Sequence, residues 1–150
     1  MAKKPATTPA FKIVPETERE FFPKLRIRSS SEAKEFCRKF YFEDINVYES
    51  CFILMLNRAN FTVGYAKISQ GGLTGTVVDV KIICKYAIDN LASSIVLCHN
   101  HPSGNIQPSE EDITITNRIK AALNVLDVKL NDHIILTEDD AFSFTDNGLL

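Results

Sequence analysis

The chain has 150 residues, the length of one ordinary domain that can bury a hydrophobic core of its own. Hydrophobic residues make up 45% and charged residues 24%, which is typical of a soluble globular protein, and no apolar run reaches the ~20 residues of a membrane span. The formal net charge of -2 excludes the strongly basic composition of proteins that bind nucleic acids non-specifically, although it leaves room for a local basic patch.

The start of the chain and its cysteines bear on location and domain organisation. Four cysteines are spread along the chain without a Cys-x-x-Cys pair, and no apolar segment follows the basic start as it would in a signal peptide. We therefore expect a cytoplasmic protein with reduced thiols. Residues 1–10 lack periodicity and predict a flexible tail, and residues 11–150 predict a single domain.

The apolar patterns predict an alternation of strands and helices. In chain order these are an edge strand at 24–28, a helix from a capping box at 29–32 to about residue 40, two paired strands at 49–57 and 61–68, a loop at 70–75, a helix at 80–92, a strand at 94–98, a helix at 110–126, and two strands at 129–136 and 142–144. Strands 49–57 and 94–98 are almost unbroken apolar runs, which predicts burial on both faces. This order indicates a mixed sheet with helices on its faces.

Two of these helices have an apolar face, which predicts the side chains that they bury. In helix 80–92 the face consists of Val80, Ile83, Cys84, Ala87, Ile88 and Leu91. In helix 110–126 it consists of Ile113, Ile115, Ile119, Ala122, Leu123 and Leu126.

Two histidines after the second apolar run are the most informative residues of the chain. His99 and His101 stand two positions apart at the end of a strand, so both imidazoles point to one side. A turn then leads to a helix whose first turn contains Asp112, which can return to the same point. Two histidines and one carboxylate, with a position open for water, form a common catalytic zinc arrangement. The pattern predicts that His99, His101 and Asp112 hold one Zn²⁺ ion.

Metal-activated water needs a nearby general base, and Glu49 is the strongest candidate by position. It opens a strand that we expect in the same sheet as the strand ending at His99. A solvated charge at a strand end is the competing interpretation of Glu49, favoured about two to one because most glutamates lie on the surface. For His99 and His101, the competing interpretation is a loop pair that bonds the backbone.

Three further residues also have competing structural roles. Ser109 and Asp112 form Ser-x-x-Asp at a helix start, which is close to a capping box, and capping alone explains them better than metal binding does. Cap and ligand are compatible, because a carboxylate in the first turn can still face a metal. His133, on the predicted strand 129–136, either lies near the site or is a half-buried strand histidine with local bonds.

The stretch from Glu49 to Asp112 resembles the JAMM (JAB1/MPN/Mov34, MPN+) metalloprotease motif. That motif is a Glu, then, well downstream, His-x-His, seven residues that begin with Pro, and Ser-x-x-Asp, and every element is present here. The closer resemblance is to the bacterial RadC-like branch, which shares His-Asn-His-Pro-Ser-Gly at 99–104 and Asp-His-Ile at 132–134. The similarity runs from about residue 30 to residue 150.

The resemblance implies a fold and a role for each residue of the motif. The fold would be an MPN or cytidine-deaminase-like three-layer α/β/α sandwich around a mixed sheet. Zinc would be held by His99, His101 and Asp112 with water as the fourth ligand, Glu49 would be the general acid and base, and Ser109 would stabilise an oxyanion. The chain departs from the wider family in having Asn100 where eukaryotic members commonly have Ser or Thr, and Asn57 where relatives are often acidic.

Two hypotheses of function follow. The first is a zinc metallopeptidase that cleaves peptide or isopeptide amide bonds in an unidentified protein or peptide substrate. The second is a non-catalytic, metal-containing module associated with DNA repair or processing. The net charge does not support DNA as a partner, and residues 1–29 show no helix-hairpin-helix pattern of the kind that RadC-like proteins often carry. We expect no membrane partner, and the oligomeric state is open.

Two other enzyme classes are disfavoured. A base deaminase would carry His-x-Glu and Pro-Cys-x-x-Cys, which are absent. The letters His-Asn-His are no evidence for an HNH nuclease, because the residues of that motif are dispersed along the chain.

Overall fold

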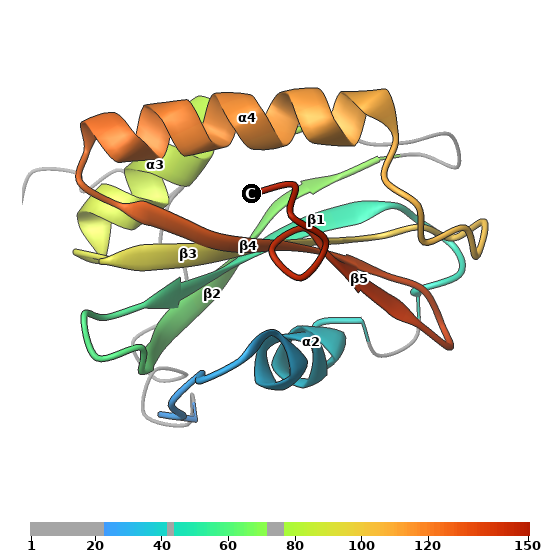
Figure 1. The fold of residues 1–150 in the computed structure, drawn as a ribbon, viewed down its shortest axis with the longest axis horizontal. Helices are drawn as coiled ribbons and strands as arrows, with labels where there is room; N and C mark the ends of the chain where they lie inside the picture. Colours follow the sequence, from blue (N-terminus) through green and yellow to red (C-terminus); the bar gives the residue numbers. More distant parts are fainter. Residues whose placement is uncertain (1–22, 42–43, 72–76) are drawn as a thin grey trace, which may run out of the picture.

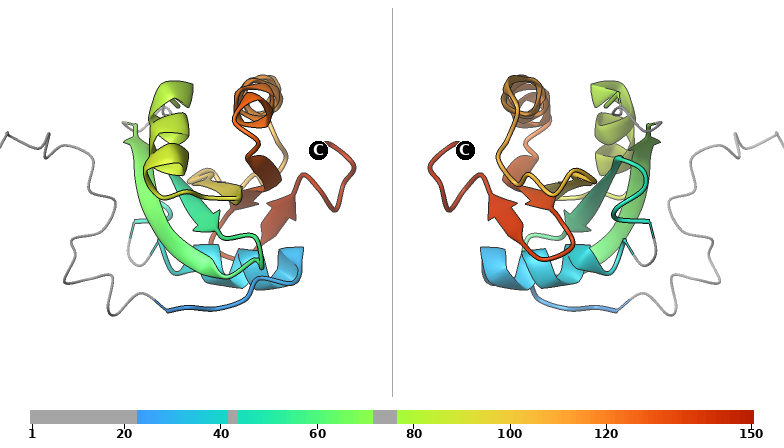
Figure 2. Two further views of the ribbon diagram at one scale, coloured as in Figure 1. Left: turned by 90° about the vertical axis from the view of Figure 1, so that its left-hand side faces the viewer. Right: turned by 90° about the vertical axis from the view of Figure 1, so that its right-hand side faces the viewer.

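The computed structural model describes residues 23–41, 44–71 and 77–150, so the predicted tail at 1–10 lies outside the described residues and the division at residue 11 stays a prediction. The elements are α2 (Ser30–Arg38), β1 (Ser50–Leu56), β2 (Thr62–Gln70), α3 (Val80–Asp89), β3 (Ser94–Asn100), α4 (Glu110–Val125), β4 (Lys129–Leu136) and β5 (Ala141–Ser143). The strands form one sheet in the order β2-β1-β3-β4-β5, with α2 on one face and α3 and α4 on the other (Figures 1 and 2). The predicted three-layer α/β/α sandwich is confirmed.

The directions of the strands bring distant parts of the chain to one edge of the sheet. Strand β1 runs antiparallel to both β2 and β3, whereas β3 and β4 are parallel and are connected through α4. In this register Cys51 of β1 pairs with His99 of β3, and His99 pairs with Ile135 of β4. The start of β1 therefore lies beside the carboxyl ends of β3 and β4.

The core lies on both faces of β1 and β3, and every residue of these two strands is buried, as their apolar runs predicted. Alternate residues enter different layers. Ile53, Met55 and Leu97 pack in the cluster beneath α3 and α4, whereas Leu54 and Val96 pack in the cluster above α2. Burying each large aliphatic side chain stabilises the fold by about 1.5–3 kcal/mol, so the strands that carry the site are anchored from both sides.

The predicted buried face of α3 was partly wrong. Ile83 and Ala87 are buried, but Ile88 is 53% and Leu91 is 86% exposed. Ile88 is rotated about 100° from Ala87 around the helix axis, away from the sheet. Leu91 follows the end of α3 with a φ of 49°, and the N–H of Ala92 turns back to bond the Ala87 carbonyl, so Ala92 packs inside instead.

The predicted face of α4 was also partly wrong. Ile119 and Leu123 are buried, whereas Ile113 is 36% and Leu126 is 37% exposed. Ile113 lies about 120° around the helix from Ile119, and Leu126 follows the last helical residue. Thr116 takes an inward position, where its hydroxyl contacts His133. The remaining predicted residues of both helices are half-buried, namely Val80 and Cys84 of α3 and Ile115 and Ala122 of α4.

The remaining differences lie at element ends. Segment 24–28 makes a single bridge, Arg26 to Phe61, rather than a strand, and helix α2 ends before residue 40. Ser29 caps α2, but the Glu32 carboxylate accepts from Arg28 instead of completing the box. The predicted loop at 70–75 begins later, because β2 continues through residue 70, and residues 72–76 lie outside the described part. Among the described residues, no helix has the length and apolarity that a membrane span requires.

Candidate metal centre

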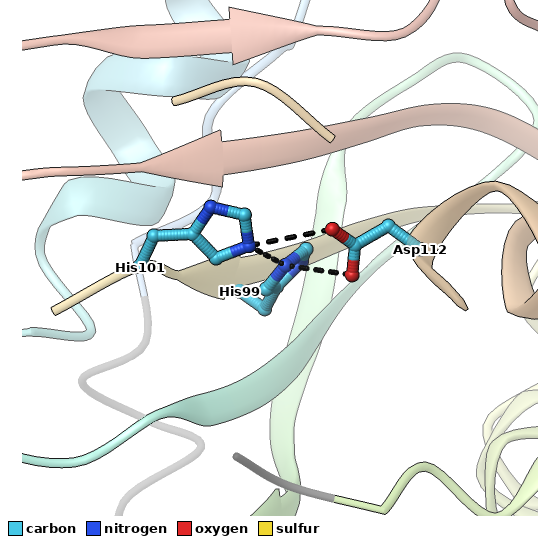
Figure 3. Close-up of side chains that lie close together, drawn as sticks. All are labelled: His99, His101 and Asp112. Carbon is cyan, nitrogen blue, oxygen red and sulfur yellow. Dashed lines mark hydrogen bonds and ion pairs between the residues drawn. The ribbon is translucent and has the colours of Figure 1, made fainter. Parts of the chain in front are cut away.

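Three side chains converge at the carboxyl end of β3. His99 Nε2 and His101 Nε2 lie 2.8 Å apart. Asp112 Oδ1 lies 3.2 Å from His99 Nε2, and Asp112 Oδ2 lies 3.3 Å from His101 Nε2. Figure 3 shows the two ring nitrogens and the carboxylate facing one another. Within the described residues, this is the one group of three or more His, Cys, Asp or Glu side chains spaced to hold a metal ion.

Local structure places each of these side chains. His99 belongs to β3, and His101 follows it directly, with its backbone N–H still bonded to the Leu136 carbonyl of β4 at 2.9 Å. Asp112 is held by a full capping box, in which its Oδ2 accepts from the Ser109 backbone N–H at 2.7 Å and its own N–H donates to Ser109 Oγ at 3.1 Å. The capping role expected for Ser109 and Asp112 therefore coexists with an Asp112 carboxylate that faces the histidines.

The donor atoms fit a divalent zinc ion. His101 Nδ1 lies 2.6 Å from the Asn105 carbonyl oxygen, which can only accept, so Nδ1 carries the proton and the Nε2 of a neutral ring is free. Ligands about 2.0 Å from a tetrahedral ion lie about 3.3 Å from one another. The two imidazole–carboxylate distances match this value, and the contact between the two imidazoles is shorter. Two nitrogens and a carboxylate this close together could hold one cation between them.

The electrostatics of Asp112 and His101 favour their charged forms. Burial raises the pKa of Asp112, but the contacts with His101 and His99 outweigh burial and hold that pKa well below its usual range. Burial lowers the pKa of His101, but hydrogen bonds to Asp112 and to the Asn105 carbonyl raise it by more than burial lowers it. The net result is a raised pKa. Protons and a metal ion therefore compete for the same atoms.

Glu49 lies in the cavity that contains these three residues. It is half-buried, directly precedes β1, and lines a cavity of about 1160 Å³ together with His99, His101, Ser109 and Asp112. Its carbonyl accepts the Gly71 N–H at 2.9 Å, and its charge contributes to the raised pKa of His101. The structure thus places Glu49 in the same cavity as the histidines. Its catalytic role stays a prediction.

Ser109 lies on the rim of the same cavity, where it is exposed. Its Oγ accepts the Asp112 N–H, which leaves the hydroxyl hydrogen able to donate toward the cavity. The structure thus brings all five predicted site residues to one cavity.

In the sequence, Asn100 stands out only as a departure from the wider family. In the structure, its side chain binds backbone groups at the start of β1 and in the segment before it. It is fully buried and points away from the histidines on either side. Its Oδ1 accepts the Ser50 N–H at 2.8 Å, and its Nδ2 donates to the carbonyls of Ile45 at 2.7 Å and Tyr48 at 2.8 Å. A buried amide in a histidine-containing strand was the signal that could have revealed this role.

The sequence does not decide whether His133 lies near the site. In the structure, His133 contacts His99. It is 1% exposed, with Nε2 2.7 Å from His99 Nδ1 and Nδ1 2.6 Å from Thr116 Oγ1. Its ring stacks on Phe144 with centroids 4.5 Å apart. Burial, followed by the neighbouring His99, lowers the pKa of His133 well below its ordinary value. Thr116 was missed, because a threonine on an apolar helix face carries no sequence signal for this contact.

Comparison with known proteins gives a consistent result. Residues 27–149 match the family described as the RadC-like JAB domain. A UPF0758 protein of Flavobacterium johnsoniae is 45% identical over 102 residues, which cover 68% of this chain and 44% of the relative. UPF0758 proteins of Porphyromonas gingivalis and Chlorobaculum parvum are 45% and 41% identical, and cover 68% of this chain and 45% and 46% of the relatives. The chain therefore spans less than half the length of these relatives, whose names state no activity.

Proposed function

The chain belongs to the RadC-like JAB domain family, and we propose that it is a zinc-dependent metallohydrolase that cleaves peptide or isopeptide amide bonds. The observation that carries the proposal is the convergence of His99 Nε2, His101 Nε2 and the Asp112 carboxylate in a cavity that Glu49 also lines. Two ring nitrogens, one carboxylate and a further carboxylate in the same cavity are the parts that hydrolysis by metal-activated water requires.

Zinc, when bound, would polarise the carbonyl of the scissile amide and make a neighbouring water molecule acidic. The residues that would hold it are His99, His101 and Asp112. The two rings are held on the sides that face away from the site by contacts with His133 and the Asn105 carbonyl, and the Asp112 carboxylate is held by the Ser109 N–H. Such support reduces the reorganisation needed when the ion binds.

Glu49 would move the proton. Its carboxylate accepts a proton from water as the water oxygen forms a bond to the amide carbon. The carbon–nitrogen bond then breaks, and Glu49 returns the proton to the leaving nitrogen, so that the products are a carboxylic acid and an amine. Ser109 Oγ–H would donate to the carbonyl oxygen while that oxygen carries negative charge.

The size and lining of the cavity favour a peptide as the substrate. Its volume of about 1160 Å³ exceeds the ~300–1,000 Å³ of pockets that bind small ligands. Apolar side chains line it beside the charged group, among them Val78, Leu97 and Ile115. Such a wall suits the side chains of a peptide on one side of the bond to be cleaved.

The test combines metal analysis with a panel of peptide and isopeptide substrates. We expect about one zinc per chain and turnover of at least one substrate class. Glu49→Gln should lower kcat by about 10²- to 10⁴-fold without loss of zinc. Glu35→Gln, on the exposed surface of α2, is the matched control and should leave both unchanged.

Two outcomes would contradict the proposal. Full turnover by Glu49→Gln would remove the assigned base. A zinc-loaded protein that cleaves no substrate but shows a salt-dependent shift of DNA would favour the non-catalytic alternative.

A further inference from the structure

We propose that His133 and Thr116 are positioning residues that keep the ring proton of His99 on Nδ1, so that His99 Nε2 is left free for the metal. This inference rests on the proposed function, since it assigns these residues a role toward the same ion. It is carried by an unbroken row of short hydrogen bonds whose directions follow from donor and acceptor chemistry and from the burial of His133.

The direction is set first at Thr116. Its Oγ1 lies 2.5 Å from the Asp112 carbonyl oxygen and 2.6 Å from His133 Nδ1. A hydroxyl has one hydrogen, and a carbonyl oxygen can only accept, so the hydrogen of Thr116 points to Asp112. Thr116 Oγ1 must then accept from His133, which places a proton on His133 Nδ1.

The next bond follows from the single proton of a neutral ring. His133 is buried between Thr116, His99 and Phe144, and among the described residues no acidic side chain bonds either of its ring nitrogens. A charged imidazolium in that environment would be costly, so the ring is neutral and its Nε2 is an acceptor. His99 Nδ1, 2.7 Å away, therefore donates.

The consequence appears on the other side of His99. A neutral His99 ring has a single N–H proton, and here that proton is on Nδ1. The ring therefore presents an unshared electron pair at Nε2, the atom that faces His101 and Asp112 in Figure 3. A ring with the opposite tautomer would place a proton where the ion binds. His101 reaches the same state through the Asn105 carbonyl, so the two ligands are oriented by different devices.

The row of bonds also begins at a metal ligand. The carbonyl that accepts from Thr116 belongs to Asp112, and the Asp112 carboxylate lies beside His99 Nε2. Asp112 and His99 are thus connected twice, once across the site and once behind it. Thr116 occupies the inward position of α4 because this second connection passes through it.

A direct test is the position of each ring proton, read from long-range ¹H–¹⁵N correlation spectra of histidine-labelled protein. In metal-free protein with chelator, His133 should carry its proton on Nδ1. In zinc-loaded protein, His99 should carry its proton on Nδ1 with Nε2 unprotonated. A proton on His133 Nε2, or ligation through His99 Nδ1, would overturn the inference whether or not any substrate is cleaved.

A second test uses variants and metal affinity. Thr116→Val removes the hydroxyl at nearly constant volume and should weaken binding of Zn²⁺ and Co²⁺ by about 10- to 100-fold, with a changed visible spectrum of the Co²⁺ form. Thr116→Ser keeps the hydroxyl and should restore both. His133→Gln, which retains an acceptor, should bind metal more tightly than His133→Leu.

Thr62→Val is the matched control. Thr62 is buried and also donates to a carbonyl, that of Pro23 at 2.6 Å, while accepting an N–H, that of Leu25 at 2.9 Å, but at the far end of β1 from Glu49. It should lose stability without losing metal affinity. Equal metal affinity for Thr116→Val and wild type, or an equal loss in Thr62→Val, would overturn the inference. Correct ring protons and affinities without turnover would instead contradict the proposed function.

Discussion

The side chain of Asn100 holds the backbone of Ser50 through a bond of 2.8 Å from the Ser50 N–H to Asn100 Oδ1. Its Nδ2 donates to the Tyr48 carbonyl, so the backbone on both sides of Glu49 is bonded to one amide. Asn100 itself lies between His99 and His101. A single residue therefore ties the backbone on both sides of the candidate base to the strand end that carries the two imidazoles.

Asn100→Ala should consequently lower stability and turnover together. It leaves the buried Ser50 N–H and two carbonyls without their partner, which costs about 1–3 kcal/mol in the free energy of unfolding. Asn100→Asp retains the acceptor for Ser50 but turns a second carboxylate oxygen toward the Ile45 and Tyr48 carbonyls in a buried place, so it should lose at least as much. Urea unfolding, zinc content and kcat would be measured for both. A kcat that falls no further than in Thr62→Val at equal loss of stability would show that Asn100 only supports the fold.

Ser109 has two tasks that substitution can separate. Ser109→Ala removes the acceptor for the Asp112 N–H and should lower the free energy of unfolding by about 1 kcal/mol. It should also lower kcat by about 10²-fold if the hydroxyl stabilises an oxyanion. Ser109→Thr retains the hydroxyl and should largely restore both quantities. Unchanged kcat in Ser109→Ala would leave capping as its whole contribution.

Stability of the metal-free protein should depend on pH through His101. Its pKa in the folded protein is raised above the ordinary 6.5, so the folded state binds this proton more tightly than the unfolded state does. The stabilising contribution is therefore fully present below about pH 6.5 and is lost as pH rises through the raised value. Asp112, whose pKa is lowered, stays ionised throughout this range.

The measurement is the difference in unfolding free energy between wild type and His101→Gln, both with chelator. We expect a larger difference at about pH 6 than at about pH 9. A difference that grows with pH would contradict the direction of the shift.

Thiol labelling should show whether Cys51, which lines the cavity, is accessible to a reagent. Cys37, Cys51 and Cys98 are at most 1% exposed, and burial is the largest cause of the raised pKa of Cys51. Only Cys84 is half-buried. Ellman's reagent should therefore label one thiol in the native protein and all four after denaturation, and Cys84→Ser should abolish native labelling. A second native thiol that disappears in Cys51→Ser would show that the cavity admits the reagent.

The sequence predicted the sheet and the convergence of His99, His101 and Asp112 well, for a local reason. Strands β1 and β3 are unbroken apolar runs, and His99, His101 and Asp112 come from one continuous stretch whose strand end and helix start fix their directions. Placing Glu49 in the same cavity required the antiparallel pairing of β1 and β3, which the strand order only suggested.

The contacts that the sequence could not supply are those between elements distant in the chain. The bond of Thr116 to His133 depends on how α4 is rotated over β4, and that rotation also leaves Ile113 exposed. A hydrophobic pattern reports an average preference for burial and cannot distinguish a threonine that bonds an imidazole from one that merely fits. The exposed Ile88 and Leu91 reflect the same limit, because the exact end of α3 decides their environment.

The antiparallel pairing of β1 and β3 also bears on how much of the fold each part of the site needs. His99, His101 and Asp112 are neighbours along the chain, whereas Glu49 joins their cavity only through a long-range strand contact. Under the proposed function, the three residues that would hold zinc depend mainly on one continuous segment, and the base depends on the whole sheet. A molecule in which β1 is displaced would then keep its zinc ligands together and lose its base.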